Sequence, residues 1–226
     1  MKCTPLAIKR YHSGVPTRSS EQPNTCLPGH LPIKEHAMPH QLWSQDTYMK
    51  AYKFAAGAHL GQLVPGTQIS YLMHISIVSM EVIAGLAHEP GHDQDLAVQC
   101  ALLHDVIEDT SVTSDQVETE FGPDVAAGVS ALTKNSSLDK HLQMEDSLNR
   151  IRQQPSAVWI VKLSDRICNL QPPPPYWTRE KRERYREEAR QILQALGSAS
   201  PYLAGRLQYK IDAYEEFLDP TPMNSR

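Results

Sequence analysis

The sequence predicts an all-α protein, with one helical domain following an N-terminal extension. From Gln45 onward, apolar residues recur at helical spacing in one segment after another. No pair of alternating strands joined by a hairpin turn stands out. The apolar run Val158–Val161 could alone be a buried strand, but Leu163, Ile167 and Leu170 continue it at helical spacing. A helix is therefore the better interpretation of this segment too.

Proline and glycine mark where the helices end. Gly61 and Pro65-Gly66 follow the first periodic segment, Gly122 precedes Pro123, and Pro155 closes another segment. Four consecutive prolines, residues 172–175, form a stiff connector that cannot continue a helix. Between these breakers the apolar periodicity predicts helices over residues 45–59, 70–86, 114–121, 125–132, 138–153, 157–170, 179–196 and 202–218.

The most informative segment follows a capping residue, His92 or Asp93. Its apolar positions recur at steps of four, three and four, and they predict one helix with a single apolar stripe. We expect the polar residues near its carboxyl end to project toward one end and side of that helix, since they are spaced four apart in two pairs. The stripe is formed by Leu96, Cys100, Leu103 and Ile107, and the polar residues are His104, Asp105, Glu108 and Asp109.

Residues 1–42 lack hydrophobic periodicity and are rich in proline, serine, threonine and histidine. We expect them to form a flexible N-terminal extension, with the folded domain over residues 43–226. The histidines of this extension, His30, His36 and His40, are expected to be solvated rather than to bind a metal.

Composition favours a small ligand over a polymer. The formal net charge is −4, which gives no general attraction to nucleic acid or to an anionic membrane, so a phosphate-bearing ligand would need local cations or a metal. Cys100 and Cys168 lie in apolar helical segments and are expected to be free, buried thiols, which suggests a reducing cytoplasm. No secretory signal or stretch of eighteen apolar residues is apparent, so a membrane span is not expected.

His104 and Asp105 stand side by side within an apolar run. An imidazole and a carboxylate together suit a divalent ion such as Mn²⁺, Fe²⁺ or Zn²⁺, and ionisable groups in such a run are costly unless something pairs with them. An isolated His-Asp pair is more often structural, but Glu108 and Asp109 follow closely, and acidic groups packed this tightly need a cation or a shared proton. The sequence thus favours a metal-assisted hydrolase.

Two further candidates lie in other apolar helices: His74 in residues 71–75 and Asp165 in residues 161–167. Each alone is more often a satisfied buried polar residue. Together with His104-Asp105 they give the order His, His-Asp, Asp on three helices.

That order resembles the HD phosphohydrolases, whose fold is an all-α helical bundle. The run from Ala101 to Thr110 resembles the hydrolase domain of RelA/SpoT proteins and of the metazoan SpoT homologue. The run from Val161 to Leu170 is similar to that family's second signature, and His59-Leu-Gly-Gln62 is similar to its opening motif. The likeness extends over about residues 48–196 and suggests a stand-alone small alarmone hydrolase, without a synthetase domain.

The resemblance implies a metal-dependent hydrolase that removes the 3′-diphosphate of (p)ppGpp as pyrophosphate. It implies that the bound ion is Mn²⁺, that an acidic pair positions or deprotonates the attacking water, and that three residues bind the nucleotide. Carried over to this sequence, the metal ligands are His74, His104, Asp105 and Asp165, the acidic pair is Glu108 and Asp109, and the nucleotide contacts are Asn169, Lys181 and Tyr185. A solvated helix face is an equally good interpretation of Lys181 and Tyr185.

One departure from the family concerns substrate identity. The family places an Arg-Lys pair after its opening motif, whereas residues 63–71 here contain no cation. This difference leaves open an HD phosphohydrolase acting on another nucleotide, such as (p)ppApp or NADPH. A non-catalytic nucleotide sensor is a third interpretation, although no member of the metal or acidic set is missing.

Overall fold

The computed structural model describes residues 43–218, and within that range the regular structure is helical. The only β pairing among these residues is an isolated bridge between Leu63 and Ser70, so the all-α prediction is confirmed. The expected extension over residues 1–42, with its histidines, lies outside the described residues, as do residues 219–226. The helices are α1 Gln45–Ala58, α2 Leu72–His88, α3 Gln94–Leu103, α4 Val106–Asp109, α5 Ser114–Phe121, α6 Pro123–Leu132, α7 Gln143–Arg152, α8 Ser156–Asn169, α9 Arg179–Leu196 and α10 Pro201–Ala213, with 3-10 turns at Gly197–Ala199 and Tyr214–Phe217.

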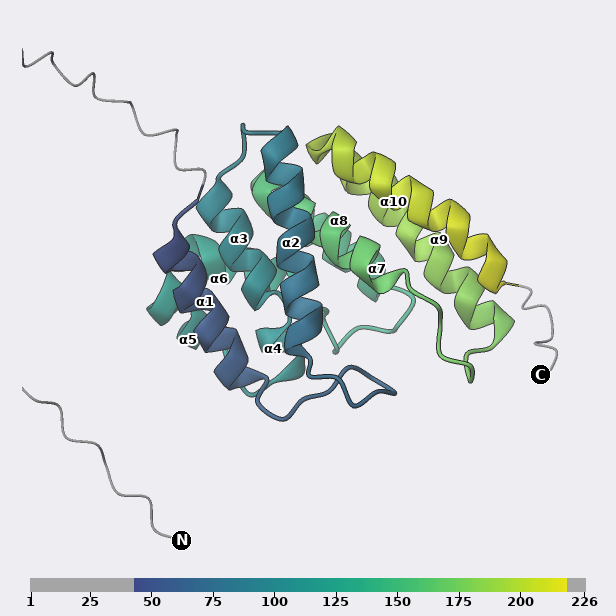
Figure 1. Ribbon diagram of the computed structural model, residues 1–226, viewed down its shortest axis with the longest axis horizontal. Helices are drawn as coiled ribbons and strands as arrows, with labels where there is room; N and C mark the ends of the chain where they lie inside the picture. Colours follow the sequence, from purple (N-terminus) through teal and green to yellow (C-terminus); the bar gives the residue numbers. More distant parts are fainter. Residues whose placement is uncertain (1–42, 219–226) are drawn as a thin grey trace, which may run out of the picture. The chain divides into compact units, whose positions relative to one another are not determined.

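Helices α3 and α8 form the centre of the domain (Figure 1). They pack against each other and against α2, while α1 and α6 cover α3, and α9 and α10 cover α8. Leu102 and Leu103 of α3 and Ile160 and Leu163 of α8 have no exposed surface. Burial of each such side chain stabilises the fold by roughly 1.5–3 kcal/mol. The apolar stripes predicted for these two segments therefore form the core from which the polar residues project.

Local signals in the sequence set several helix ends. The carboxylate of Asp93 accepts a hydrogen bond from the backbone N–H of Leu96 at 3.0 Å and caps α3. Thr113 and Gln116 form a reciprocal capping box at the start of α5. Pro123 occupies the first turn of α6, where its missing N–H costs nothing, so this helix starts two residues earlier than the expected Val125.

The segment before α7 differs from expectation, because the helix begins at Gln143 rather than at Leu138. The side chain of Asn135 accepts a hydrogen bond from the backbone N–H of Ser137 at 3.1 Å, and the backbone then makes two turns. Such side-chain hydrogen bonds offer the backbone an alternative to the helix. At the other end of the chain, α10 stops at Ala213 and a 3-10 turn replaces the last turn of the predicted helix.

The predicted continuous helix through residue 109 is wrong, since α3 ends at Leu103 and a separate short helix, α4, begins at Val106. The imidazole Nδ1–H of His104 donates to the carbonyl oxygen of Ala101 at 2.8 Å. That carbonyl is the acceptor that an unbroken helix would offer to the N–H of Asp105, so the side chain competes with the backbone at this point. Asp105 has φ −106° and ψ −1°, a conformation between the two helices.

Cys100 and Cys168 are buried and free, as the sequence predicts. Burial raises the pKa of the Cys100 thiol to about 12, with a smaller contribution from the charge of Asp93, so this thiol stays protonated and packs as an apolar group. Between residues 43 and 218, no helix combines the length and hydrophobicity that a membrane-spanning segment requires.

Candidate active site

Four predicted metal ligands meet where α2, the α3–α4 junction and α8 come together. The Nε2 atoms of His74 and His104 lie 3.2 Å apart. Asp105 Oδ2 lies 3.0 Å from Nε2 of His104 and 3.7 Å from Nε2 of His74. Asp165 Oδ1 lies 3.5 Å from Nε2 of His74 and 3.8 Å from Nε2 of His104. One donor atom each from His74, His104 and Asp165 falls within 4.8 Å of the others.

The charges of this cluster support one another. Burial alone would lower the pKa of His104, but the adjacent carboxylate of Asp105, and then Asp165, outweigh it and raise that pKa to about 9. Burial would raise the pKa of Asp165, yet the charge of Lys162 and the two histidines hold it well below its ordinary value. Both carboxylates are therefore ionised at neutral pH, and without a bound cation their charge is balanced by the His104 imidazolium and by Lys162.

Tyr71, at the start of α2, donates its hydroxyl hydrogen to Oδ2 of Asp105. Burial, followed by the charge of Asp105, raises the pKa of this phenol far above its ordinary value. The phenol therefore remains a hydrogen-bond donor at any physiological pH and fixes the orientation of the Asp105 carboxylate.

Glu108, in the short helix α4, points toward the loop that follows α6. Its Oε2 accepts a hydrogen bond from the backbone N–H of Lys134 at 3.0 Å, and its Oε1 accepts one from Nζ of the same lysine at 2.7 Å. Burial would lower the pKa of Lys134, but the hydrogen bond and charge of Glu108 raise it, so the ammonium stays charged. Both oxygens of Glu108 are thus held by one residue.

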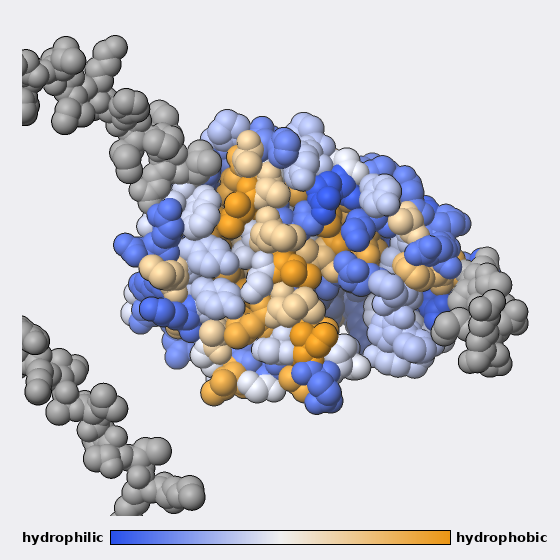
Figure 2. Space-filling model, in the orientation of Figure 1, coloured by the Kyte–Doolittle hydropathy of each residue, from blue (hydrophilic) through white to orange (hydrophobic). Residues whose placement is uncertain are grey.

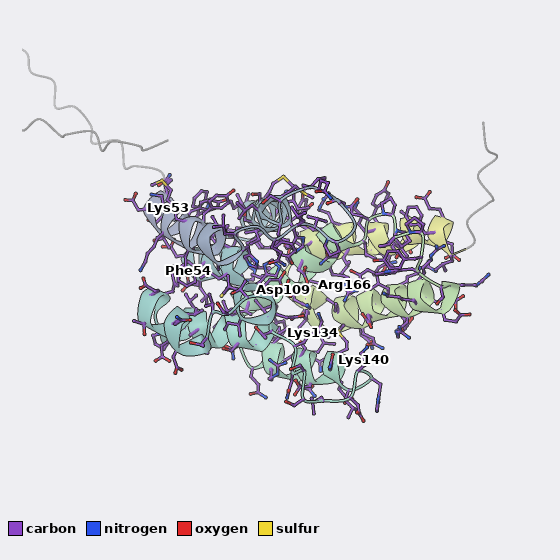
Figure 3. The ribbon with its side chains drawn as sticks, turned by 90° about the horizontal axis from the view of Figure 1, so that it is seen from below. Lys53, Phe54, Asp109, Lys134, Lys140 and Arg166 are labelled. Carbon is purple, nitrogen blue, oxygen red and sulfur yellow. The ribbon has the colours of Figure 1, made fainter. Side chains whose placement is uncertain are left out.

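Asp109 is held from the other side, by the segment between α1 and α2. Gln62 donates from its amide nitrogen to Oδ2 of Asp109 at 3.3 Å, and its amide oxygen accepts a hydrogen bond from Nδ1 of His59 at 2.7 Å. Burial, then the charge of Asp105, raises the pKa of Asp109. Figure 3 shows Asp109 and Lys134 close to the middle of the domain, with Lys140 farther out.

Two further polar residues of α8 face Asp165. Lys162 donates from Nζ to Oδ2 of Asp165 at 3.2 Å, and the amide of Asn169 donates to Oδ1. These contacts come from positions three residues before and four residues after Asp165, so one face of α8 presents all three side chains.

Lys181 and Tyr185 are set back from this centre. Nζ of Lys181 lies 4.0 Å from the ring centroid of Trp177, and the Tyr185 ring meets Trp177 edge-on at a centroid distance of 5.1 Å. The guanidinium of Arg166 lies 4.3 Å from the Tyr185 ring centroid and so links this aromatic pair to α8. Neither residue lines the cavity at the cluster.

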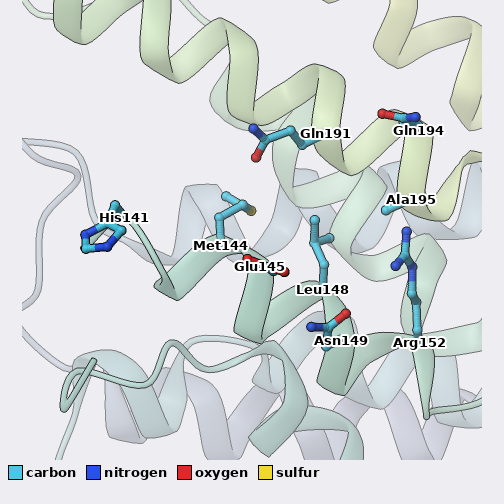
Figure 4. Close-up of a pocket in the computed structure, with 9 residues that line it drawn as sticks. All are labelled: His141, Met144, Glu145, Leu148, Asn149, Arg152, Gln191, Gln194 and Ala195. Carbon is cyan, nitrogen blue, oxygen red and sulfur yellow. The ribbon is translucent and has the colours of Figure 1, made fainter. Parts of the chain in front are cut away.

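A cavity of about 230 Å³ opens onto the His/Asp cluster. Its lining is mostly polar and includes both cations, Lys134 and Lys162, which the sequence interpretation did not single out. A larger cavity of about 530 Å³ lies elsewhere, between α7 and α9 (Figure 4). We assign chemistry to the smaller cavity because the buried, mutually paired ionisable groups converge there. It is lined by Tyr71, His104, Asp105, Glu108, Asp109, Leu132, Lys134, Lys162, Asp165 and Asn169.

Residues 51–201 match the family of the HD domain. The chain belongs to the HD domain family. Its similarity to individual relatives is moderate. The chain is 29% identical to the Xenopus tropicalis protein named guanosine-3′,5′-bis(diphosphate) 3′-pyrophosphohydrolase MESH1, over 71% of this chain and 90% of that protein. The human protein of the same name is 32% identical, over 55% of this chain and 72% of its own length.

Solved structures agree with this assignment. A structure described as a metazoan orthologue of SpoT that hydrolyses ppGpp superposes with a TM-score of 0.65 at 27% identity, covering 75% of this chain and 96% of its own. A Listeria monocytogenes protein, 18% identical, shares the fold with a TM-score of 0.52 over 67% of this chain. The predicted HD helical bundle is therefore confirmed.

The donor set of this HD domain fits a divalent metal ion. Two imidazole nitrogens and two carboxylates converge from three elements, a combination that suits divalent ions of the first transition row. The hydrogen bond from Nδ1 of His104 to Ala101 fixes a proton on that nitrogen and directs Nε2 into the cluster, which is the usual arrangement of a metal-bound imidazole. The hydrogen bond from the Tyr71 hydroxyl likewise orients the carboxylate of Asp105.

Three residues that shape the site were not predicted from the sequence. Lys162 had a usable signal, because it stands three residues before Asp165 in an otherwise apolar run. Tyr71 had only its place in the segment after the opening motif. Lys134 had none, since it reaches Glu108 from a loop 26 residues later in the chain.

Proposed function

We propose that this HD domain hydrolyses the 3′-diphosphate of guanosine alarmones, converting (p)ppGpp to GDP or GTP and pyrophosphate. The observation that carries the proposal is the acidic pair, Glu108 and Asp109, beside a His/Asp cluster in a chain whose relatives are named guanosine-3′,5′-bis(diphosphate) 3′-pyrophosphohydrolase. We further propose Mn²⁺ as the ion, with His74, His104, Asp105 and Asp165 as its ligands, and the cytoplasm as the location.

The residues of the cavity divide the reaction between them. When bound, the ion supplies Lewis-acid polarisation of a phosphoryl oxygen and lowers the pKa of a nearby water. The carboxylate of Glu108, held at both oxygens by Lys134, is oriented to accept a proton from the attacking water. Asp109, whose pKa is raised by burial and by Asp105, is suited to hold a proton and to return it to the leaving group.

Binding of the nucleotide is assigned to residues on α8 and α9. Asn169 lines the cavity and already donates a hydrogen bond within it. Lys181 and Tyr185 both lie against the ring of Trp177, outside the cavity lining, and this cation with its aromatic rings suits a phosphate or a base of a nucleotide that extends out of the cavity. Lys134 and Lys162 supply positive charge beside the acidic residues, in a chain with no cation over residues 63–71.

The test is pyrophosphate release by the purified chain with Mn²⁺, measured side by side on ppGpp, pppGpp, ppApp, NADPH and simple 5′-nucleotides. We expect release from the guanosine 3′-diphosphates, loss of that release in Glu108→Ala, and no loss in Glu118→Ala, an exposed glutamate on α5. Because the expected basic pair is absent, hydrolysis of another nucleotide is the second candidate. No release from ppGpp, with turnover of another member of the panel, would establish it.

A further inference from the structure

The connection between α8 and α9, residues 170–178, contains four consecutive prolines followed by Tyr176. Figure 1 shows this connection running out from the end of α8 and back to the start of α9. Its surface is pale blue in Figure 2, as expected of proline and tyrosine, while strongly hydrophobic surface gathers over α2. No residue of the connection lines the cavity at the His/Asp cluster. The proposed hydrolysis therefore leaves the proline run without a role.

Consecutive prolines fix the backbone of this segment. Proline holds φ at about −65°, and a residue that precedes a proline is restricted to extended conformations. Both restrictions act on Pro172, Pro173 and Pro174, and these residues lie outside helices and strands. We therefore expect a polyproline II helix, which has about three residues per turn and no internal hydrogen bonds. The chain leaves it in a turn, where the N–H of Trp177 donates to the carbonyl oxygen of Pro174 at 3.0 Å.

The proline rings and two of the carbonyl oxygens are accessible. Pro172 and Pro175 are exposed, and Pro173 and Pro174 are half-buried. Positions three apart share an edge of a polyproline II helix, so Pro172 and Pro175 form the outward edge of this one. Within residues 43–218, the carbonyl oxygens of Pro172 and Pro173 accept no hydrogen bond. The run thus offers both ring surface and unpaired acceptors to a partner.

Tyr176 adds an aromatic side chain at the end of the run. It is 72% exposed, and in the described part of the chain its ring packs on no other aromatic ring and its hydroxyl makes no hydrogen bond. Tyrosine often dominates the binding energy of protein interfaces, because it buries a large ring and keeps a polar tip. Residues 172–176 therefore form one continuous binding surface, which we call the proline–tyrosine segment.

We propose that the proline–tyrosine segment binds a WW domain of another protein. WW domains hold polyproline II segments in a groove lined by aromatic rings. A tyrosine that directly follows the prolines fits a second pocket beside such a groove, in the order Pro-Pro-x-Tyr, and residues 173–176 have that order. The fixed backbone favours the complex, since a run of prolines tied at both ends to helices loses little conformational freedom on binding.

A second copy of this chain does not offer the groove that the segment requires. Among the large hydrophobic residues of positions 43–218 that are well exposed, the aromatic ones are Tyr176 and Tyr209. Tyr209 lies on α10 and Tyr176 on the connection between α8 and α9, so the two belong to different elements. We therefore expect the aromatic groove to come from a different protein.

The first test is calorimetric titration of the full chain with an isolated WW domain that selects Pro-Pro-x-Tyr ligands. We expect saturable binding at a single site. Tyr176→Ala should raise the dissociation constant at least about tenfold, as loss of an interface anchor does. Tyr209→Ala, at a tyrosine of α10 that is also 72% exposed, is the matched control and should leave binding unchanged. Circular dichroism and thermal unfolding report whether both variants remain folded.

Substitution of the prolines tests the backbone conformation separately. Pro173→Ala combined with Pro174→Ala should weaken binding by a similar factor, because it removes ring surface and frees the backbone. Pro90→Ala, at an exposed proline after α2, should have no effect. The same titration with a synthetic peptide of residues 169–178, with and without the two substitutions, does not depend on the fold.

Three results would overturn the proposal. The first is the absence of binding to the full chain, including the case in which only the peptide binds, because the folded chain would then hide the segment. The second is binding that Tyr176→Ala leaves unchanged or that Tyr209→Ala weakens equally. The third is tighter binding of an SH3 domain, which also holds polyproline II segments, since the tyrosine would then not select the partner.

Discussion

Lys134 donates two hydrogen bonds to the Glu108 carboxylate, from its backbone N–H to Oε2 at 3.0 Å and from its side-chain Nζ to Oε1 at 2.7 Å. The two residues come from different elements, α4 and the loop after α6, so this contact ties the acidic pair to the opposite wall of the cavity. A carboxylate that must accept a proton from water gains from a fixed orientation, because misplacement of a reacting group is costly in rate. We therefore regard Lys134 as a positioning residue for Glu108.

Substitution of Lys134 by methionine is expected to lower kcat by about tenfold or more with a smaller change in KM, because the side chain acts through Glu108. Lys134→Arg keeps the charge and should restore part of the rate. Steady-state pyrophosphate release with Mn²⁺ checks both variants.

Lys140 provides the control for this change. It is an exposed lysine on the same loop, farther from the cluster, and Lys140→Met should leave both parameters unchanged (Figure 3). A rise in KM alone for Lys134→Met would indicate that this lysine binds phosphate and does not position Glu108.

Metal binding and proton transfer should be separable by substitution. Asp105→Ala removes a ligand and should abolish both metal binding and activity. Glu108→Ala should retain the metal and lose roughly 10²- to 10⁴-fold in rate, the usual contribution of a general base. Metal content after gel filtration, measured by elemental analysis, distinguishes the two classes. Activity in both variants would show that the site is misassigned.

The metal should also stabilise the fold. A ligand that binds only the native state at a concentration 100 times its dissociation constant adds about 2.7 kcal/mol to the free energy of unfolding. Chelation should therefore lower Tm, and added Mn²⁺ should restore it in the wild type but not in Asp105→Ala. Equal Tm values for the chelated and loaded wild-type protein would argue against these ligands.

Tyr71→Phe tests the support of Asp105. Loss of a hydrogen bond to a metal ligand typically weakens metal affinity by about 10- to 100-fold. We expect that weakening here, with most of the activity recovered at saturating Mn²⁺, because the phenol contacts no reacting group. A metal titration of activity measures it, with Tyr209→Phe, an exposed tyrosine of α10, as control. An unchanged metal affinity would contradict the role of Tyr71.

The fold was largely predictable because its core helices carry their own signals. Periodicity identified α3 and α8, and the predicted capping residue Asp93 lies directly before the first residue of α3. The break between α3 and α4 was not predictable in this way. It arises where the side chain of His104 takes the carbonyl of Ala101, a choice that depends on the whole cluster around that imidazole.

The candidate site, like the fold, has residues that the sequence predicts and residues that it does not. His104 and Asp105 are adjacent in the chain, and the order of His74 and Asp165 around them is a sequence pattern, so the cluster could be proposed before its geometry was known. The role of Lys134 could not be predicted, because no sequence pattern around a surface lysine in a polar loop indicates which carboxylate it contacts in the folded chain. Contacts between distant segments are set by tertiary packing, which periodicity does not report.

Two helix-interior glycines provide a matched pair for stability. A Cβ on Gly128 of α6 would lie 2.7 Å from Sγ of Cys100 and 3.1 Å from a methyl of Val158, where α6 approaches α3 and α8. Gly128→Ala should therefore overpack the core and destabilise the fold by about 1–3 kcal/mol. A Cβ on Gly205 of α10 would meet nothing within 4 Å, so Gly205→Ala should stabilise by about 0.5–1 kcal/mol. Urea unfolding measures both. Equal shifts would show that helix propensity alone, and not the close approach of the helices, decides the outcome.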